Sequence, residues 1–237
     1  MPVAIVSGAS SGIGLAIVRA LAEHGYAVVA NARRIGSELP GLHADGLVTV
    51  AGDVGDPADA RRIFEAAITH FDGVDLLVNN AGVFIPKPFA EYSVGDFDRL
   101  LKTNVLGFFH LTQHVLAHMV RRGRGHVINI TTSLAENPIK AVPSVLPILT
   151  KGGLNAATRA LAQEYAAAGV RVNAVSPGII RTPMHEAADH GFLATLHPVG
   201  RMGAVEDVVR GVLYLEEASF VTGEILHVDG GAYYGRW

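Results

Sequence analysis

The chain of 237 residues contains no cysteine, which excludes disulfide bonds, thiolate nucleophiles and zinc–sulfur sites together. It also lacks a strong excess of either charge: the formal net charge is −3, so neither nucleic acid nor an anionic membrane surface is indicated as a partner. No apolar run approaches the ~20 residues that a membrane span requires. The N-terminal residues MPVAIVSGAS lack the basic segment of a signal peptide. We therefore expect a cytoplasmic protein.

Short apolar runs alternate regularly with longer helix-like stretches. The expected strands are residues 3–7, 27–32, 47–52, 74–80, 126–131, 170–175 and 224–229. Most of these runs are continuously apolar, as in strands covered on both faces. Helices are expected between them, for example over 12–25 and 57–71. The alternation predicts one α/β domain over 1–237, a doubly wound Rossmann-type fold with a seven-stranded, mainly parallel sheet and helices on both faces.

A glycine-rich loop, SGASSGIG (7–14), connects the first strand to the first helix. Its glycines, at positions 8, 12 and 14, allow a tight turn and let a pyrophosphate approach bare backbone, where helix N–H groups stabilise negative charge. Glycine-rich loops also serve simple turns. The position at the start of a β–α–β unit nevertheless favours a dinucleotide-binding site.

The end of the second strand bears on cofactor choice. A site selective for NAD generally carries an acidic residue here, whereas this sequence has Ala32 followed by Arg33 and Arg34. An arginine suits the 2′-phosphate of NADP through charge-assisted hydrogen bonds. The alternative is a pair of exposed loop arginines. The sequence favours NADP(H) over NAD(H).

Eight motifs follow one another along nearly the whole chain. They are SGASSGIG (7–14), GDV (52–54), NNAG (79–82), KTN (102–104), VINITTS (127–133), LTKGGLNAATRALAQEYA (149–166), VRVNAVSPGIIRTPM (170–184) and VTGEILHVDGG (221–231). In these motifs the sequence resembles the short-chain dehydrogenase/reductase family. The resemblance implies hydride transfer between NADP(H) and a small-molecule carbonyl or alcohol substrate.

The resemblance also implies a set of cofactor-binding residues, with Asp53 and Val54 near the adenine and Thr182 near the nicotinamide carboxamide. The full set is Gly8, Ser10, Gly12, Ile13, Gly14, Arg33, Arg34, Asp53, Val54, Asn80, Ala81, Gly82, Lys151, Pro177, Gly178 and Thr182.

The family's catalytic residues are asparagine, serine, tyrosine and lysine. Asn104 and Lys151 match the first and the last of these. Spacing best assigns the serine to Ser133, with Thr132 second, although adjacent hydroxyls at a strand end can also make ordinary local hydrogen bonds. The tyrosine position holds Pro147, which has neither a hydroxyl nor an N–H.

Proline is compatible with a helix at this point. Ser144 is an expected N-cap, which would place Pro147 at the third helical position, where the backbone N–H has no intrahelical partner to lose. Lys151 then lies one turn further on, on roughly the same face. We expect the helix to form without the tyrosine.

Two functions remain open. In the first, an oxidoreductase uses another proton donor: Lys151, directly or through a water linked to Asn104, or else Glu136, Lys140 or His185. In the second, the protein binds NADP(H) without catalysis and has a sensing, regulatory or partner-binding role. The first function is favoured because a protein that used only the adenosine half of the cofactor would not need the nicotinamide-side residues. These are Asn104, Lys151, Pro177, Gly178 and Thr182.

The last expectations concern the substrate lid and assembly. The resemblance implies a mobile lid over about 184–204 and a homo-oligomer, a dimer or tetramer, with the helices around 95–119 and 144–168 at an interface. Within the lid, His185 and His190 are five residues apart and so do not share a helical face as a metalloprotease motif requires. No metal site is expected.

Overall fold

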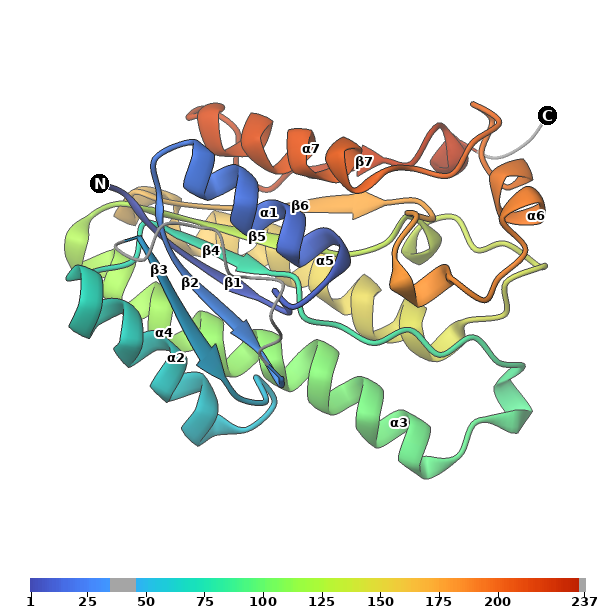
Figure 1. Ribbon diagram of the computed structural model, residues 1–237, viewed down its shortest axis with the longest axis horizontal. Helices are drawn as coiled ribbons and strands as arrows, with labels where there is room; N and C mark the ends of the chain where they lie inside the picture. The colour runs from blue at the N-terminus through green and yellow to red at the C-terminus, as the bar shows by residue number, and fades with distance from the viewer. Residues whose placement is uncertain (35–45, 235–237) are drawn as a thin grey trace.

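A computed structural model of the protein describes residues 1–34 and 46–234 (Figure 1). Its strands are β1 (Val3–Ser7), β2 (Ala27–Ala32), β3 (Leu47–Ala51), β4 (Leu76–Asn79), β5 (Gly125–Ile130), β6 (Val170–Pro177) and β7 (Ile225–Val228). They form one sheet in the order β3-β2-β1-β4-β5-β6-β7, and every adjacent pair is parallel. The predicted doubly wound, seven-stranded sheet is confirmed.

Helices cover both faces of the sheet (Figure 1). On one face, α1 (Gly12–Glu23) and α7 (Val205–Glu217) pack in one apolar cluster. On the other face, α2 (Pro57–Phe71), α4 (Gly107–Arg122) and α5 (Val145–Tyr165) pack in a second. All residues of β1 and β2 are buried between these layers, which is why both strands are apolar except for Ser7 and Asn31 at their carboxyl ends.

The remaining helical elements are short. They are α3 (Val94–Leu100), α6 (His190–Thr195) and 3₁₀ turns at Phe89–Glu91, Ser133–Ala135, Ala166–Ala168, Pro183–His185 and Ala232–Tyr234. Among the described residues, no helix has the length and apolar character needed to cross a bilayer.

A π-helical turn, Leu101–Leu106, joins α3 to α4 and contains Lys102 and Asn104. In it the backbone N–H of Gly107 donates to the carbonyl of Lys102. Single π-turns are rare and often occur at functional sites. Here the turn places the KTN motif at the carboxyl end of the sheet.

The first turn of α5 accommodates Pro147 as expected. Val145 is the first helical residue and Pro147 the third, and the regular ladder starts where the Ile148 N–H donates to the Ser144 carbonyl at 2.9 Å. Ser144 holds the N-cap position, but its hydroxyl donates to the carbonyl of Val142 and does not cap the helix. The predicted N-cap position of Ser144 is confirmed. The expectation that its side chain caps the helix was wrong.

Candidate active site

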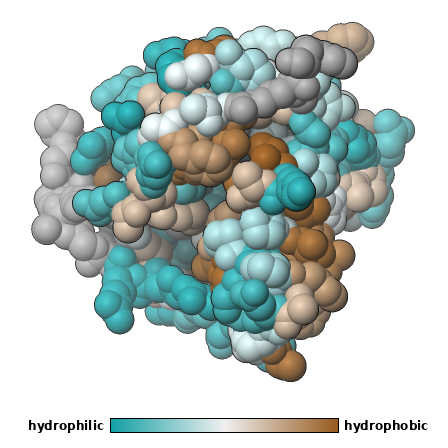
Figure 2. Space-filling view, turned by 90° about the vertical axis from the view of Figure 1, so that its right-hand side faces the viewer, coloured by the Kyte–Doolittle hydropathy of each residue, from teal (hydrophilic) through white to brown (hydrophobic). Residues whose placement is uncertain are grey.

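A cavity of about 1010 Å³ opens at the carboxyl ends of the strands. It is lined by the loop after β1, the ends of β2 and β3, the segments after β4, β5 and β6, and the middle of α5. Ligands of open α/β sheets bind at this edge, where the strand order reverses, here between β1 and β4. Figure 2 looks onto this side of the molecule and shows a hollow bordered by both hydrophilic and hydrophobic side chains.

Nearly all residues predicted for the site line this one cavity. They are Gly8, Ser10, Gly12, Ile13, Gly14, Arg33, Arg34, Asp53, Val54, Asn80, Ala81, Gly82, Ser133, Lys151, Pro177, Gly178 and Thr182. Of the predicted set, Asn104 alone does not line it.

The glycine loop leaves backbone N–H groups free at the start of α1. Ser11 occupies the N-cap position without a side-chain hydrogen bond to the helix, and the first turn has no acidic residue. Asn80 fixes the loop, because its Nδ2 donates to the carbonyls of Ser7 at 2.9 Å and Gly8 at 3.1 Å. An uncapped helix N-terminus of this kind suits an anionic group such as a pyrophosphate.

Position 14 has no space for a side chain, so it requires glycine. A Cβ at this position would lie 2.2 Å from the Gly8 carbonyl oxygen and 2.4 Å from Nδ2 of Asn80. We expect Gly14→Ala to displace the loop and lower NADPH affinity by about 100-fold or more, equivalent to roughly 2.7 kcal/mol. Fluorescence titration with NADPH measures this.

The matched control is Gly153→Ala, because a Cβ there meets nothing within 4 Å. On a helix this change should leave NADPH affinity unaltered and stabilise the fold by roughly 0.5–1 kcal/mol, seen as a higher Tm. Wild-type NADPH affinity in Gly14→Ala would contradict the assignment of the loop.

An ion pair at the β2–β3 edge was not anticipated from the sequence. The Nζ of Lys102 lies 3.0 Å from the carboxylate of Asp53. Burial raises the pKa of Asp53, but the hydrogen bonds from Lys102 and from the Gly55 N–H outweigh it and hold that pKa below its usual value. Asp53 is therefore ionised and already partnered, and Arg33 and Arg34 remain exposed beside it.

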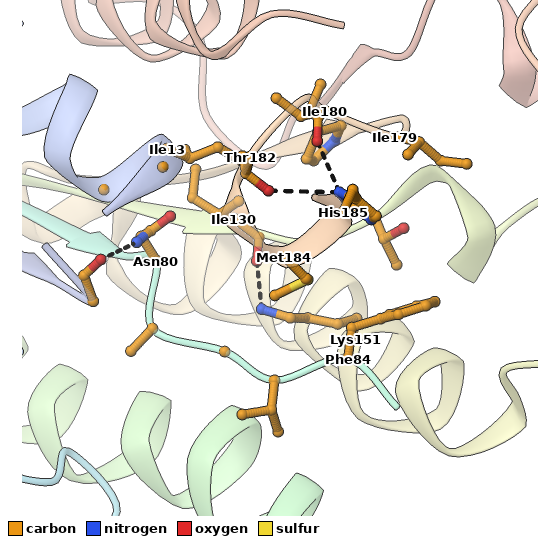
Figure 3. A pocket seen from close by; sticks show the side chains of 18 of the residues that line it. Ile13, Asn80, Phe84, Ile130, Lys151, Ile179, Ile180, Thr182, Met184 and His185 are labelled. Atoms are coloured by element: carbon orange, nitrogen blue, oxygen red, sulfur yellow. Dashed lines mark hydrogen bonds between the residues drawn. The ribbon is translucent and has the colours of Figure 1, made fainter. Parts of the chain in front are cut away.

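Lys151, on α5, lines the cavity beside Ile130, Phe84 and Met184 (Figure 3). Its Nζ donates to the Ile130 carbonyl at the end of β5, at 2.7 Å. Within the described part of the chain it forms no ion pair with a carboxylate. Burial lowers the pKa of Lys151 to about 8, so the amine can both release and take up a proton near neutral pH.

The three hydroxyls after β5 have different environments. Thr131 donates to the Val175 carbonyl of β6, and Thr132 accepts the N–H of Leu134 at the start of a 3₁₀ turn. The Oγ of Ser133 makes no hydrogen bond within the described residues, although the side chain is buried in the cavity wall. Ser133 is therefore fully available to a ligand, and Thr132 keeps its O–H for donation.

Asn104 is buried behind the wall. Its Oδ1 accepts the N–H of Val83 at 2.8 Å, and its Nδ2 donates to the Val83 carbonyl and to Oγ1 of Thr150, both at 3.1 Å. Both amide hydrogens are thus used by protein groups. The side chain ties the segment after β4 to the π-turn and to α5.

No tyrosine lines the cavity among the residues that the structure describes. The hydroxyl of Tyr92 donates to the Ile85 carbonyl at 2.6 Å, and that of Tyr26 donates to Glu216 at the other edge of the sheet. Burial raises the pKa of both phenols. Neither phenol lies in the cavity.

Of the three further candidate donors, Glu136, Lys140 and His185, only His185 lines the cavity. Glu136 instead accepts from Arg159 and His227, at 3.1 and 2.7 Å, and Lys140 is exposed outside the cavity. The Nδ1 of His185 donates to the Ile180 carbonyl at 2.9 Å, and burial lowers the pKa of the imidazole. His185 is consequently neutral near pH 7 and presents an acceptor, Nε2, to the cavity.

His190 donates from Nε2 to the backbone carbonyl of His185. In the described ranges, no three His, Asp or Glu side chains are grouped so that they could hold a metal ion.

Several cavity residues were missed by sequence reasoning. They include Phe84, Pro86, Thr103, Ile139, Val142, Ile179 and Ala232. The segments after β4, β5 and β6 follow directly from predicted strands, so the rule that ligands bind at carboxyl ends would have indicated them. Nothing in the sequence indicates Ala232, which reaches the cavity only through the fold of the C-terminal segment.

Comparison with known proteins defines the class. The family described as Enoyl-(Acyl carrier protein) reductase matches residues 8–233. The granaticin polyketide synthase putative ketoacyl reductase 2 of Streptomyces violaceoruber is 38% identical over 98% of this chain and 96% of its own. The chain belongs to the short-chain dehydrogenase/reductase family, which confirms the resemblance read from its motifs.

Solved structures agree over the whole fold. ElxO with one tyrosine replaced by phenylalanine and NADPH bound has a TM-score of 0.91 at 27% identity, covering 99% of each chain. The 3-ketoacyl-(acyl-carrier-protein) reductase of Brucella melitensis, complexed with NADH, has a TM-score of 0.91 at 30% identity, covering 98% of each.

Proposed function

We propose that the protein is an NADP(H)-dependent oxidoreductase that transfers hydride between the nicotinamide and a carbonyl or alcohol substrate, with Lys151 as proton donor in place of a tyrosine. The observation that carries this proposal is the position of the Lys151 ammonium. It lies in the cavity wall with a pKa lowered to about 8 and no carboxylate partner among the described residues. A general acid works best when its pKa is close to the operating pH.

The residues of the cavity fit the cofactor. The uncapped N-terminus of α1 and the bare backbone at Gly14 suit the pyrophosphate, and Pro177, Gly178 and Thr182 would hold the nicotinamide end. When bound, NADPH supplies the hydride. A Cβ at Gly82 would lie 3.0 Å from Nζ of Lys151, so the glycine keeps the space beside the amine open.

The protein's own part in the reaction concerns the substrate oxygen. Ser133 Oγ, which has no internal partner, would donate to that oxygen and orient it. Lys151 would then release a proton to the oxygen as negative charge develops there, directly or through a water. Asn104 supports the site indirectly, because it fixes Val83 and the first turns of α5.

The cofactor preference rests on the arginines after β2. We expect Arg33→Ala to lower NADPH affinity by about 10- to 100-fold and to leave NADH affinity unchanged, because a charge-assisted hydrogen bond to the 2′-phosphate contributes roughly 1.5–3 kcal/mol. Arg34→Ala is tested in parallel. Arg61→Ala on α2, an exposed arginine paired with Glu65 outside the cavity, is the control. Equal losses for NADPH and NADH would count against a 2′-phosphate contact.

A second function is a catalytically inactive NADP(H)-binding protein. It is favoured by the absence of tyrosine from the described cavity wall, together with the neighbour ElxO, whose tyrosine-to-phenylalanine variant still holds NADPH. In that case Lys151 would only bind the nicotinamide ribose.

One experiment separates the two functions. Purified protein is titrated with NADPH and NADH, and a panel of aldehydes, ketones and diketones is then added while nicotinamide absorbance is followed. Turnover that Ser133→Ala and Lys151→Ala both abolish would establish the oxidoreductase. Tight NADPH binding without turnover of any compound would support the inactive binding protein.

We also propose that residues 1–237 form one domain with a substrate lid at about 184–204. Within the lid, the Nδ1 of His197 donates to the Leu193 carbonyl. Its Nε2 accepts the N–H of Ile179 and so joins the lid to the segment after β6. Exposed Phe109 on α4 and Leu149 on α5 support a homo-oligomer through these helices. Light scattering in solution tests the assembly.

A further inference from the structure

Formal charge is confined to part of the cavity wall. Of the described lining residues, Arg33, Arg34 and Asp53 carry charge beside the ends of β2 and β3, the adenosine side of the proposed cofactor site. Lys151 carries the remaining charge, at the reacting centre. The described wall beyond Lys151 and Ser133 holds no acidic residue, lysine or arginine.

The cavity wall beyond Lys151 and Ser133 is largely apolar. It is built from three chain segments: after β4 with Phe84, after β5 with Ile139 and Val142, and after β6 with Met184, Leu193 and Leu196. Figure 3 shows Phe84 and Met184 in the same part of the cavity as Lys151. A substrate that extends from the reacting centre therefore meets hydrocarbon on several sides.

The two histidines of this wall do not supply a cation. His197 is buried, and both its ring nitrogens are engaged, by the Leu193 carbonyl and the Ile179 N–H. A ring that accepts at Nε2 is neutral. His185 donates from Nδ1 to the Ile180 carbonyl, and burial lowers its pKa, so it too is uncharged near pH 7.

Free hydrogen-bond donors are correspondingly few. The hydroxyls of Thr132 and Ser133 and the ammonium of Lys151 remain as donors to a ligand, because Thr132 only accepts, from the N–H of Leu134. All three belong to the reacting end of the cavity, where the substrate oxygen would be placed. A carboxylate further along the substrate would lose water without gaining a cation from the described lining residues, which costs binding free energy.

We propose that the substrate of this site is an uncharged carbonyl compound, or its alcohol, with a largely hydrocarbon body. The inference rests on the proposed function and makes it specific. It excludes sugar acids and other ketones that carry a carboxylate inside the cavity.

A matched pair of ketones tests this substrate class: 4-methylcyclohexanone and 4-oxocyclohexanecarboxylate, which share a ring and differ by a methyl or a carboxylate. The full chain saturated with NADPH is used, with binding followed by NADPH fluorescence and reduction by absorbance. The methyl compound should have a kcat/KM about 100-fold higher, because the carboxylate would be desolvated without a cation. Equal or better use of the carboxylate would overturn the proposal.

A substitution in the cavity wall tests whether the lack of positive charge is what excludes carboxylates. Met184 is exposed, so the fold should tolerate Met184→Lys, with Met184→Gln as the uncharged control. The lysine should raise the ratio of kcat/KM for the carboxylate over the methyl compound by about tenfold relative to glutamine, and salt should reduce that gain. Equal ratios in the two variants would show that missing positive charge is not what excludes carboxylates.

The outcomes separate this inference from the proposed function. If the NADPH complex binds the methyl compound selectively but reduces neither ketone, the substrate class stands and the proposed function fails. If it reduces the carboxylate faster, the function stands and the substrate class fails. Binding of neither ketone also overturns the substrate class.

Discussion

Lys151→Met is expected to lower kcat for carbonyl reduction by about 10³-fold, within the range of roughly 10²–10⁴ that a well-placed general acid contributes. Methionine keeps an unbranched apolar stem of similar length and removes the ammonium that donates to Ile130. The control is Lys140→Met, which removes an exposed lysine outside the cavity and should leave kcat unchanged. Stopped-flow absorbance under NADPH saturation gives the rate of the hydride step.

The pH dependence identifies the role of Lys151. Reduction consumes a proton and needs the ammonium form, so its rate should be level below pH about 8 and fall above it, since the lowered pKa is about 8. Alcohol oxidation needs the free amine and should rise across the same pH range. A reduction profile without this fall, together with a merely small loss in Lys151→Met, would show that the proton comes from elsewhere.

Pro147→Tyr is expected to raise kcat by about 10²-fold, because it places a phenol one helical turn before Lys151, and a nearby ammonium lowers the pKa of a phenol. Pro147 is buried at the start of α5, one turn before Lys151, which lines the cavity. Pro147→Phe, which adds the ring without the hydroxyl, is the matched control and should show no gain.

The two variants together decide how the natural protein works. A gain in Pro147→Tyr above a measurable natural rate indicates that the hydride geometry is intact and proton transfer is limiting. If tyrosine and phenylalanine change kcat equally, the hydroxyl at this position contributes no chemistry. A gain that starts from no detectable natural activity would support the inactive binding protein.

The fold could be predicted from sequence because its signal is local. Continuous apolar runs at β1 and β2 reported burial on both faces, and Gly25 marked the end of α1, where it takes a positive φ of 80°. Apart from the Ser144 side-chain cap, errors in the predicted elements were confined to their boundaries. The run at 74–80 shortened to β4, Leu76–Asn79, because the Asn80 N–H turns back to the Val78 carbonyl.

Only part of the candidate site could be predicted from the sequence. Loop glycines and Lys151 belong to compact motifs, and their positions in the cavity follow from strand order. The Lys102–Asp53 ion pair and the contacts of Asn104 with Val83 and Thr150 join distant segments. Such partner choices depend on the geometry of packed helices, including the π-turn, and no local pattern encodes them.

The first turn of α5 has a consequence for how this protein can change under selection. The backbone N–H of residue 147 would have no intrahelical acceptor whatever residue stood there, and Thr150 Oγ1 donates to the Pro147 carbonyl. Exchange between proline and another residue at 147 therefore breaks no backbone hydrogen bond of the helix. Mutations here are therefore limited by side-chain packing and not by the backbone ladder, so a donor at this position can be lost or regained while the helix and the cofactor site persist.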